Sequence, residues 1–249
     1  MIDFQTNLIF PIHAVPAAGP LPAGAEEIST QSADGQPLWG VHMAPSRRRR
    51  QEDRTLILGF GGNAWNAQDV ASYLHDLYPE AEVVAFHYRG YRPSAGSPSA
   101  QALLADAPLV FDFAVGEVKP TQTIAVGFSI GSGIAARLAA ERPVDGLILV
   151  TPFDSLKAAA QALYPWAPIG PFFQHEIDAA AALERSKVPV AIIAGERDDL
   201  ILPARTAALR RRSANLVFDR VIAGASHNDI YGRSDFQESM REALTAVSK

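Results

Sequence analysis

The chain contains 249 residues, 48% of them hydrophobic, and its 22 basic and 27 acidic side chains give a formal net charge of -5. This length allows a sizeable core within one domain over residues 1–249, and the charge supplies no broad cationic surface for nucleic acid or an anionic membrane. Cysteine is absent, which excludes disulfides, thiolate metal sites and a cysteine nucleophile.

The first 25 residues are rich in proline and glycine and predict an extended lead-in across the domain surface. Asp3 and the breaks at Pro11 and Pro16 make this segment a poor signal peptide. No uninterrupted apolar run approaches the roughly 20 residues that a spanning helix requires. We therefore expect a cytoplasmic protein without a membrane span.

Apolar runs of strand length then alternate with segments of helix length. The runs that predict strands are residues 36–43, 55–60, 81–88, 123–128, 145–152, 188–195 and 216–223, and the segments that predict helices lie around 67–78 and 99–115, after 129, from 155, after 203 and near 237–247. This order favours parallel strands with crossover helices on both faces. Acidic residues interrupt the charged run 47–54, which is typical of a solvated loop rather than a nucleic-acid site.

The stretch "GFSIG", residues 127–131, joins an apolar strand to an alanine-rich helix. It has the G-x-S-x-G pattern of a nucleophile elbow, in which the serine occupies a strained turn and the glycines avoid collisions with the neighbouring strand and helix. The alternative is the phosphate-binding turn of a short-chain dehydrogenase, a dinucleotide-dependent oxidoreductase. That turn follows the first strand of its fold, and such enzymes use a Tyr-x-x-x-Lys pair that this sequence lacks. We therefore predict that Ser129 is a nucleophile.

A histidine and several carboxylates follow this serine in the chain. His227, in "GASHND", lies between the last predicted strand and the last helix, where it suits a general base. Glu196, Asp198 and Asp199 follow one predicted strand, and Asp154 follows the preceding one. We favour Asp198 as the acid that orients the histidine, with Asp154 as the alternative.

The loop "GFGGNAWN" follows another predicted strand at the same edge of the sheet. In an elbow enzyme, one oxyanion donor is the backbone N–H of the residue after the nucleophile, and the other comes from such a loop. These rules nominate the backbone N–H groups of Ile130 and Asn63. Gly61 and Gly62 would let the backbone approach the substrate closely.

Several ordered segments resemble the Bem46-like branch of the α/β-hydrolase family. They are "LILGFGGNAWN", "VVAFHYRGYRPSAGSPS", "VGFSIGSGIA", "LVTPFDSL", "YPW", "GERDDLILP" and "GASHND". The resemblance implies an α/β-hydrolase fold, with a mostly parallel eight-stranded sheet, helices on both faces and little or no cap domain. It also implies a triad of Ser129, Asp198 and His227, with oxyanion donors at Asn63 and Ile130.

The chain departs from the family pattern at a few positions. Gly61 stands where the family usually has histidine, His87 where it has aspartate, and Arg92 where it has glycine. Asp154 stands where threonine or serine is common. These departures leave the three triad residues in place and concern the oxyanion loop and the turn after the strand at 81–88.

The segment between Asp154 and Val188 has room for helices but not for a large cap, which predicts a fairly open acyl site. The aromatic residues proposed to line it, which suit core packing equally well, are Trp65, Tyr164, Trp166 and Phe172. We expect a serine hydrolase that cleaves small-molecule carboxylic esters or thioesters, with small to medium acyl groups, through an acyl-enzyme. This chemistry requires no metal and no organic cofactor. A non-catalytic ligand-binding protein of the same fold is the alternative.

Overall fold

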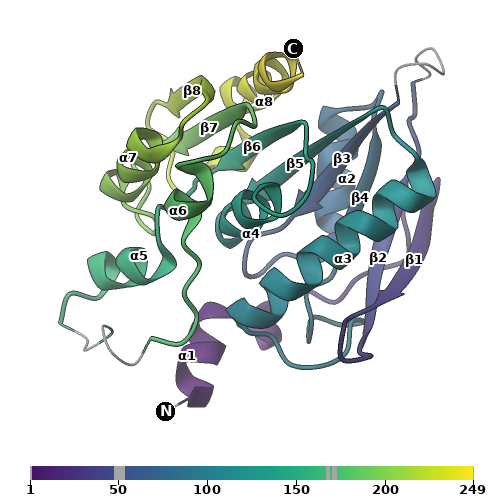
Figure 1. The fold of residues 1–249 in the computed structure, drawn as a ribbon, viewed down its shortest axis with the longest axis horizontal. Helices are drawn as coiled ribbons and strands as arrows, with labels where there is room; N and C mark the ends of the chain where they lie inside the picture. Colours follow the sequence, from purple (N-terminus) through teal and green to yellow (C-terminus); the bar gives the residue numbers. More distant parts are fainter. Residues whose placement is uncertain (1, 48–53, 167–168, 170–172, 249) are drawn as a thin grey trace.

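The computed structural model describes residues 2–47, 54–166, 169 and 173–248. Its strands are β1 (Ala25–Gln31), β2 (Pro37–Met43), β3 (Thr55–Phe60), β4 (Glu82–Phe86), β5 (Gln122–Phe128), β6 (Gly146–Val150), β7 (Val190–Gly195) and β8 (Leu216–Ile222). They form one sheet in the order β1-β2-β4-β3-β5-β6-β7-β8 (Figure 1). Neighbours from β4 to β8 are parallel, whereas β2 pairs antiparallel with both β1 and β4. The predicted eight-stranded, mostly parallel sheet is confirmed.

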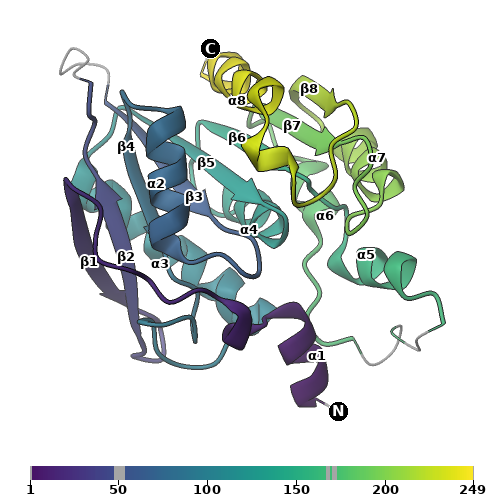
Figure 2. The same cartoon turned by 180° about the vertical axis from the view of Figure 1, so that it is seen from behind.

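Helices cover both faces of this sheet. They are α1 (Ile2–Ile9), α2 (Ala67–Leu77), α3 (Ala100–Val118), α4 (Ile130–Ala139), α5 (Leu156–Leu163), α6 (Ala179–Leu183), α7 (Pro203–Arg212) and α8 (Ser234–Val247), with short 3-10 turns at η1 (Ile12–Ala14) and η2 (Ile230–Gly232). Helices α2 and α8 lie on one face, and α3, α4, α6 and α7 lie on the other (Figures 1 and 2). Within the described ranges, no helix combines the length and the apolar character needed to cross a bilayer.

The central strands are buried on both sides. Leu56, Ile57 and Leu58 of β3 have no exposed surface, with Ile57 in the core under α2 and α8 and its two neighbours in the core under α3 and α4. Such strands appear in sequence as continuous apolar runs rather than as alternating patterns. The buried sheet is a rigid base for the loops at the carboxyl ends of β3, β5, β7 and β8.

The N-terminal segment differs from the prediction of an extended lead-in. Residues 2–9 form the helix α1, and β1 follows at the edge of the sheet. A helix this short is marginal in isolation, so its formation depends on contacts with distant residues rather than on local sequence. The edge strand β1 buries few side chains and therefore has a weak apolar pattern. The charged positions 48–53 lie outside the described residues.

Between β6 and β7, the described residues form α5, α6 and connecting segments, and no cap domain is evident there. Helices α1 and α5 lie at the same end of the molecule in both views (Figures 1 and 2).

Candidate active site

Ser129 lies in the sharp turn between β5 and α4, with φ 52° and ψ −117°. Its side chain makes no capping hydrogen bond to α4, so the hydroxyl remains directed to other partners. A Cβ at Gly127 would collide with the backbone of Gly131, and a Cβ at Gly131 would lie 2.6 Å from the carbonyl oxygen of Gly61. Both glycines are therefore steric requirements of the turn, and Gly131 also lets the loop after β3 approach Ser129.

His227 and Asp198 complete a chain of hydrogen bonds to this serine. The Nε2 atom of His227 is 3.1 Å from Ser129 Oγ, and its Nδ1 atom is 2.9 Å from Asp198 Oδ2 and 3.0 Å from Asp198 Oδ1. The imidazole and the carboxylate are both buried, at 4% exposure. An ionised carboxylate only accepts hydrogen bonds, so Nδ1 carries the proton and Nε2 is free to accept the Ser129 hydroxyl proton.

Backbone groups hold the carboxylate of Asp198 in place. Its Oδ1 accepts hydrogen bonds from the N–H groups of Leu200, at 3.0 Å, and Ile201, at 2.7 Å. Both donors belong to the loop after β7, so this loop determines the direction in which the carboxylate faces. Asp198 therefore faces His227 in a fixed orientation, in which Oδ2 and Oδ1 lie at 2.9 Å and 3.0 Å from Nδ1.

The other three candidate carboxylates have different surroundings. Asp154 forms an ion pair with Arg205 of α7, at 3.4 Å. Glu196 accepts the backbone N–H of Gly224 at 2.8 Å, and Asp199 is exposed. Of the four carboxylates considered from the sequence, the structure brings Asp198 to the imidazole.

The loop after β3 lies beside the elbow. The carbonyl of Gly62 accepts the N–H of Trp65 at 3.2 Å, so the peptide between Gly62 and Asn63 directs its own N–H away from this turn. Within the described ranges, the backbone N–H groups of Asn63 and Ile130 have no hydrogen-bond partner. Asn63, Ile130 and Ser129 also line one cavity. Asn63 and Ile130, the residues predicted to supply the oxyanion donors, thus line the same cavity as Ser129.

Two tyrosines that sequence reasoning did not select hold this loop. Tyr88 donates its hydroxyl to the carbonyl of Gly61 at 2.7 Å, and Tyr91 donates to the carbonyl of Asn63 at 2.6 Å. Burial raises the pKa of both phenols well above their usual value, so both stay protonated donors. The signal in the sequence was the "YRGY" pattern directly after β4.

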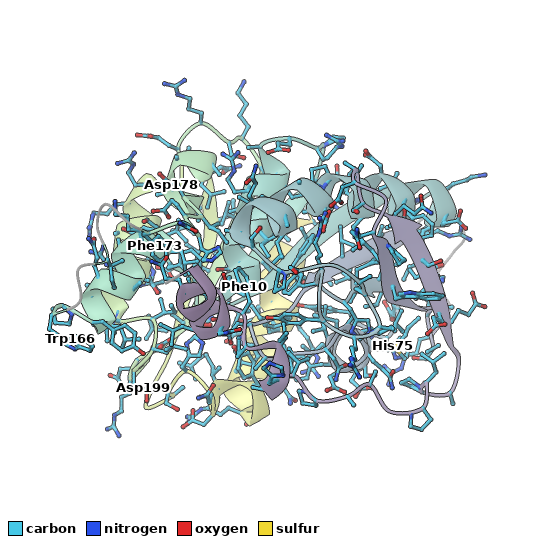
Figure 3. All side chains as sticks on the ribbon, turned by 90° about the horizontal axis from the view of Figure 1, so that it is seen from below. Phe10, His75, Trp166, Phe173, Asp178 and Asp199 are labelled. Atoms are coloured by element: carbon cyan, nitrogen blue, oxygen red, sulfur yellow. The ribbon has the colours of Figure 1, made fainter. Side chains whose placement is uncertain are left out.

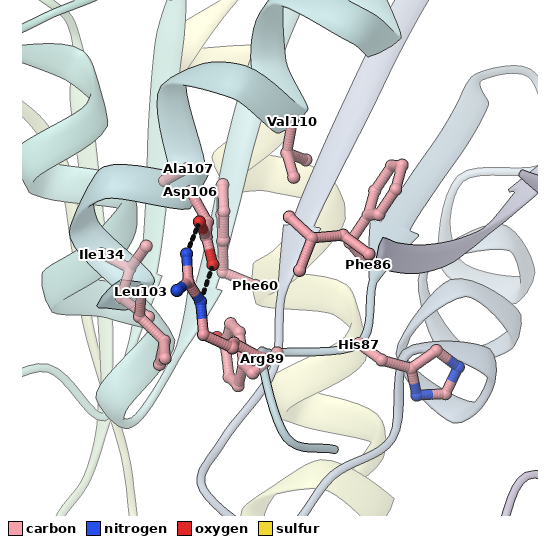
Figure 4. A pocket seen from close by; sticks show the side chains of 11 residues that line it. Phe60, Phe86, His87, Arg89, Leu103, Asp106, Ala107, Val110 and Ile134 are labelled. Atoms are coloured by element: carbon pink, nitrogen blue, oxygen red, sulfur yellow. Dashed lines mark hydrogen bonds and ion pairs between the residues drawn. The ribbon is translucent and has the colours of Figure 1, made fainter. Parts of the chain in front are cut away.

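A buried ion pair anchors the turn that carries these tyrosines. Arg89 binds Asp106 of α3 through two hydrogen bonds, at 3.0 Å from Nε and 2.6 Å from Nη2 (Figure 4). Both side chains are largely buried, at 11% and 9% exposure. Paired, planar contacts of this kind fix the guanidinium in one geometry. The ion pair therefore ties the turn that contains Arg89 to α3. The sequence departs from the family pattern close to this turn.

His87, which stands where the family usually has aspartate, is buried directly after β4 (Figure 4). Burial lowers its pKa to about 4, so the imidazole is neutral near pH 7. Its Nδ1 accepts the backbone N–H of Ala67, at 3.4 Å, at the start of α2. The histidine therefore supplies a hydrogen-bond acceptor to a helix N-terminus without a negative charge.

Two cavities meet at Ser129. One, of about 120 Å³, is apolar and extends between α1 and α5 past Leu8, Ile9 and Leu163. The other, of about 380 Å³, is more polar and is lined by residues that include His227 and Asn228. The imidazole lies on the side of the second cavity.

The predicted pocket residues lie in different surroundings. Tyr164 lines the apolar cavity, while Trp65 and Gly62 line the polar cavity. Trp166 differs from the prediction: it is 82% exposed at the outer end of α5, where its ring packs against Tyr164 (Figure 3). Gly61, in the loop after β3, is buried and lines neither cavity. Phe172 lies outside the described residues.

Comparisons with known proteins agree with this architecture. The sequence model of the alpha/beta hydrolase fold family matches residues 56–182, about half of the chain. An uncharacterized protein of Mycobacterium tuberculosis is 29% identical over 233 residues, which cover 90% of this chain and 81% of that protein. Protein bem46 of Schizosaccharomyces pombe is 29% identical over 167 residues, 64% of this chain and 56% of that protein.

A solved structure gives the same fold. An esterase of Pyrococcus furiosus has a TM-score of 0.75 at 17% sequence identity, with coverage of 94% of this chain and 97% of that one. This likeness concerns the fold, and the family match covers the strand, elbow and crossover segments from β3 to α6. The chain therefore belongs to the alpha/beta hydrolase fold family and is a relative of its Bem46-like members.

Proposed function

We propose that this hydrolase cleaves carboxylic esters or thioesters through an acyl-enzyme formed on Ser129. The observation that carries the proposal is the continuous chain of hydrogen bonds from Asp198 through His227 to the Ser129 hydroxyl. This series of hydrogen bonds ends at Ser129, where the two cavities meet, so a bound ester carbonyl would lie next to the nucleophile.

The reaction begins when Ser129 Oγ attacks the carbonyl carbon and His227 Nε2 takes the hydroxyl proton. Asp198 accepts the hydrogen bond from Nδ1–H and stabilises the imidazolium that forms. The backbone N–H groups of Asn63 and Ile130 bind the negative oxygen of the tetrahedral intermediate. Collapse of this intermediate breaks the bond to the leaving group, which receives the proton from His227.

Water then completes the cycle. His227 removes a proton from a water molecule, and the resulting hydroxide attacks the acyl carbon on Ser129. The second tetrahedral intermediate uses the same two backbone donors, and its collapse releases the carboxylic acid and restores the serine hydroxyl. All proton transfers pass through one imidazole, and the mechanism requires no cofactor.

We assign the two cavities to the two halves of the substrate on the basis of the position of the imidazole. The leaving group receives its proton from His227, so it occupies the polar cavity that His227 lines. The acyl group then occupies the apolar cavity on the other side of Ser129. A volume of about 120 Å³ is small beside the roughly 300–1,000 Å³ of drug-sized ligand sites. The preferred substrates are small molecules with short apolar acyl chains and polar leaving groups.

The direct test is turnover of p-nitrophenyl acetate and butyrate and of a short acyl thioester, combined with labelling by a fluorophosphonate probe. We expect turnover of the oxygen esters, and mass spectrometry of the labelled protein should locate the adduct on Ser129. Tight binding of ester analogues without turnover or labelling would instead support a non-catalytic binding protein and would overturn the proposal.

The Tyr91→Phe variant tests the support of the oxyanion loop. Loss of the hydroxyl removes the hydrogen bond to the Asn63 carbonyl, a contribution of about 0.5–1.5 kcal/mol, and we expect kcat to fall about two- to tenfold with KM nearly unchanged. Tyr78→Phe is the matched control, because it loses a buried bond to the Met240 carbonyl between α2 and α8. An equal loss of kcat in both variants would contradict a positioning role for Tyr91.

A further inference from the structure

Helix α1 forms one wall of the apolar cavity beside Ser129. Leu8 and Ile9 line this cavity from α1, and Leu163 lines it from α5 on the other side. Leu8 is 50% exposed and Ile9 is half-buried. Between β6 and β7, the described residues form no cap domain. The apolar cavity is thus flanked by two helices, α5 and α1, and α1 comes from residues 2–9 of the chain (Figure 2).

The buried residue His175 connects α1 to the rest of the molecule. Its Nε2 atom is 3.0 Å from Thr6 Oγ1 on α1, and its Nδ1 atom is 3.4 Å from the backbone nitrogen of Ala100 at the start of α3. The ring of Phe10, directly after α1, packs edge-on against the imidazole at 5.4 Å between centroids. Next to His175, the N–H of Gln174 donates to the side chain of Gln5 at 3.3 Å.

These partners determine the protonation of His175. The backbone nitrogen of Ala100 is a donor, so Nδ1 accepts and the ring proton lies on Nε2, which donates to Thr6 Oγ1. Burial lowers the pKa of His175 and favours this neutral form. One imidazole thus connects α1 with α3 through a donor on one side and an acceptor on the other.

We propose that α1 is the specificity element of the acyl pocket, with Leu8 and Ile9 limiting acyl-chain length and His175 acting as the positioning residue that holds α1 against the cavity. This inference rests on the proposed function, because it assigns a role to the wall of the same site. Its physical basis is the position of the side chains. The wall formed by α5 includes both small and large side chains, whereas the wall formed by α1 consists of Leu8 and Ile9, so truncation of either residue extends the cavity on the α1 side.

The first test compares p-nitrophenyl acetate, butyrate and octanoate as substrates of Leu8→Ala and Ile9→Ala. We expect the ratio of kcat/KM for octanoate to that for butyrate to rise about five- to tenfold, because the additional methylenes gain space in an apolar pocket. Leu8→Trp should lower the same ratio. Leu21→Ala is the matched control, since Leu21 is similarly exposed, at 41%, and lines neither active-site cavity.

The second test separates positioning from general stability. His175→Leu removes both hydrogen bonds, and we expect the octanoate-to-butyrate ratio of kcat/KM to rise as in Leu8→Ala. His175→Gln keeps a carbonyl acceptor and an amide donor and should restore the wild-type ratio. A merely structural role would lower the melting temperature of His175→Leu without changing this ratio.

The outcomes distinguish the two proposals. If the fluorophosphonate labels Ser129 and the esters are hydrolysed, but all α1 variants keep a chain-length ratio within about twofold of wild type, then the role of α1 is wrong and the proposed function stands. If the wild-type chain neither reacts with the probe nor hydrolyses the esters, both are wrong. A shift of opposite sign in Leu8→Ala and Leu8→Trp, with no shift in Leu21→Ala, supports the inference.

Discussion

The Ser129→Ala variant is expected to lower kcat for p-nitrophenyl butyrate by about 10⁵- to 10⁶-fold. The substitution removes the atom that forms the acyl-enzyme, while the backbone N–H groups of Asn63 and Ile130 stay in place. A residual rate of about 10³- to 10⁴-fold above the uncatalysed reaction should therefore remain. KM should change little, because the acyl chain binds in the apolar cavity. Initial rates over a range of ester concentrations measure both constants.

Ser132→Ala is the matched control for this prediction. Ser132 is a buried serine in the first turn of α4, and its hydroxyl donates to the Ser129 carbonyl rather than to His227. We expect its kcat to fall by less than about tenfold. The double variant Ser129→Ala/His227→Ala should be no slower than Ser129→Ala alone, since the two side chains act as one unit. A Ser129→Ala variant that kept a tenth of the wild-type rate would contradict the nucleophile assignment.

The parts of the site that local sequence encodes were predictable. The elbow requires a serine between glycines at the junction of a buried strand and a helix, and this requirement is visible in residues 127–131. The carboxyl ends of parallel strands meet at one edge of the sheet, so Asp198 and His227 were expected near Ser129. In the structure, His227 lies within hydrogen-bond distance of both Asp198 and Ser129. Their catalytic roles stay predictions until the variants are measured.

Contacts between segments far apart in the chain were not predictable. Thr6 of α1 lies 3.0 Å from His175 Nε2, and nothing in the pattern of residues 2–9 indicates that partner. The hydroxyls of Tyr88 and Tyr91 bind main-chain carbonyls, and these acceptors exist at every residue, so the sequence does not identify the pairs. Trp166 was expected in the pocket because its side chain is aromatic. It is exposed because it lies beyond the end of α5.

The Asp198→Asn variant is expected to lower kcat by about 10⁴-fold, and the geometry gives a specific reason. Oδ1 of Asp198 accepts two backbone hydrogen bonds, from Leu200 and Ile201. The single oxygen of an asparagine would stay with these donors, so its NH₂ group would take the place of Oδ2, the oxygen 2.9 Å from His227 Nδ1. That contact favours the tautomer with the proton on Nε2, which cannot accept the Ser129 proton, and the imidazolium also loses its negative partner.

Asp154→Asn provides the contrast, because it makes the same chemical change in the carboxylate that was the alternative acid. Its partner is Arg205 at 3.4 Å, an ion pair at partly exposed side chains. Loss of such a pair has a small effect, so kcat should stay within about threefold of wild type. Parallel measurement of kcat for both variants, with thermal melting to confirm folding, decides between the carboxylates. A larger fall for Asp154→Asn than for Asp198→Asn would make Asp154 the acid, and the hydrogen bond between Asp198 and His227 would then need another explanation.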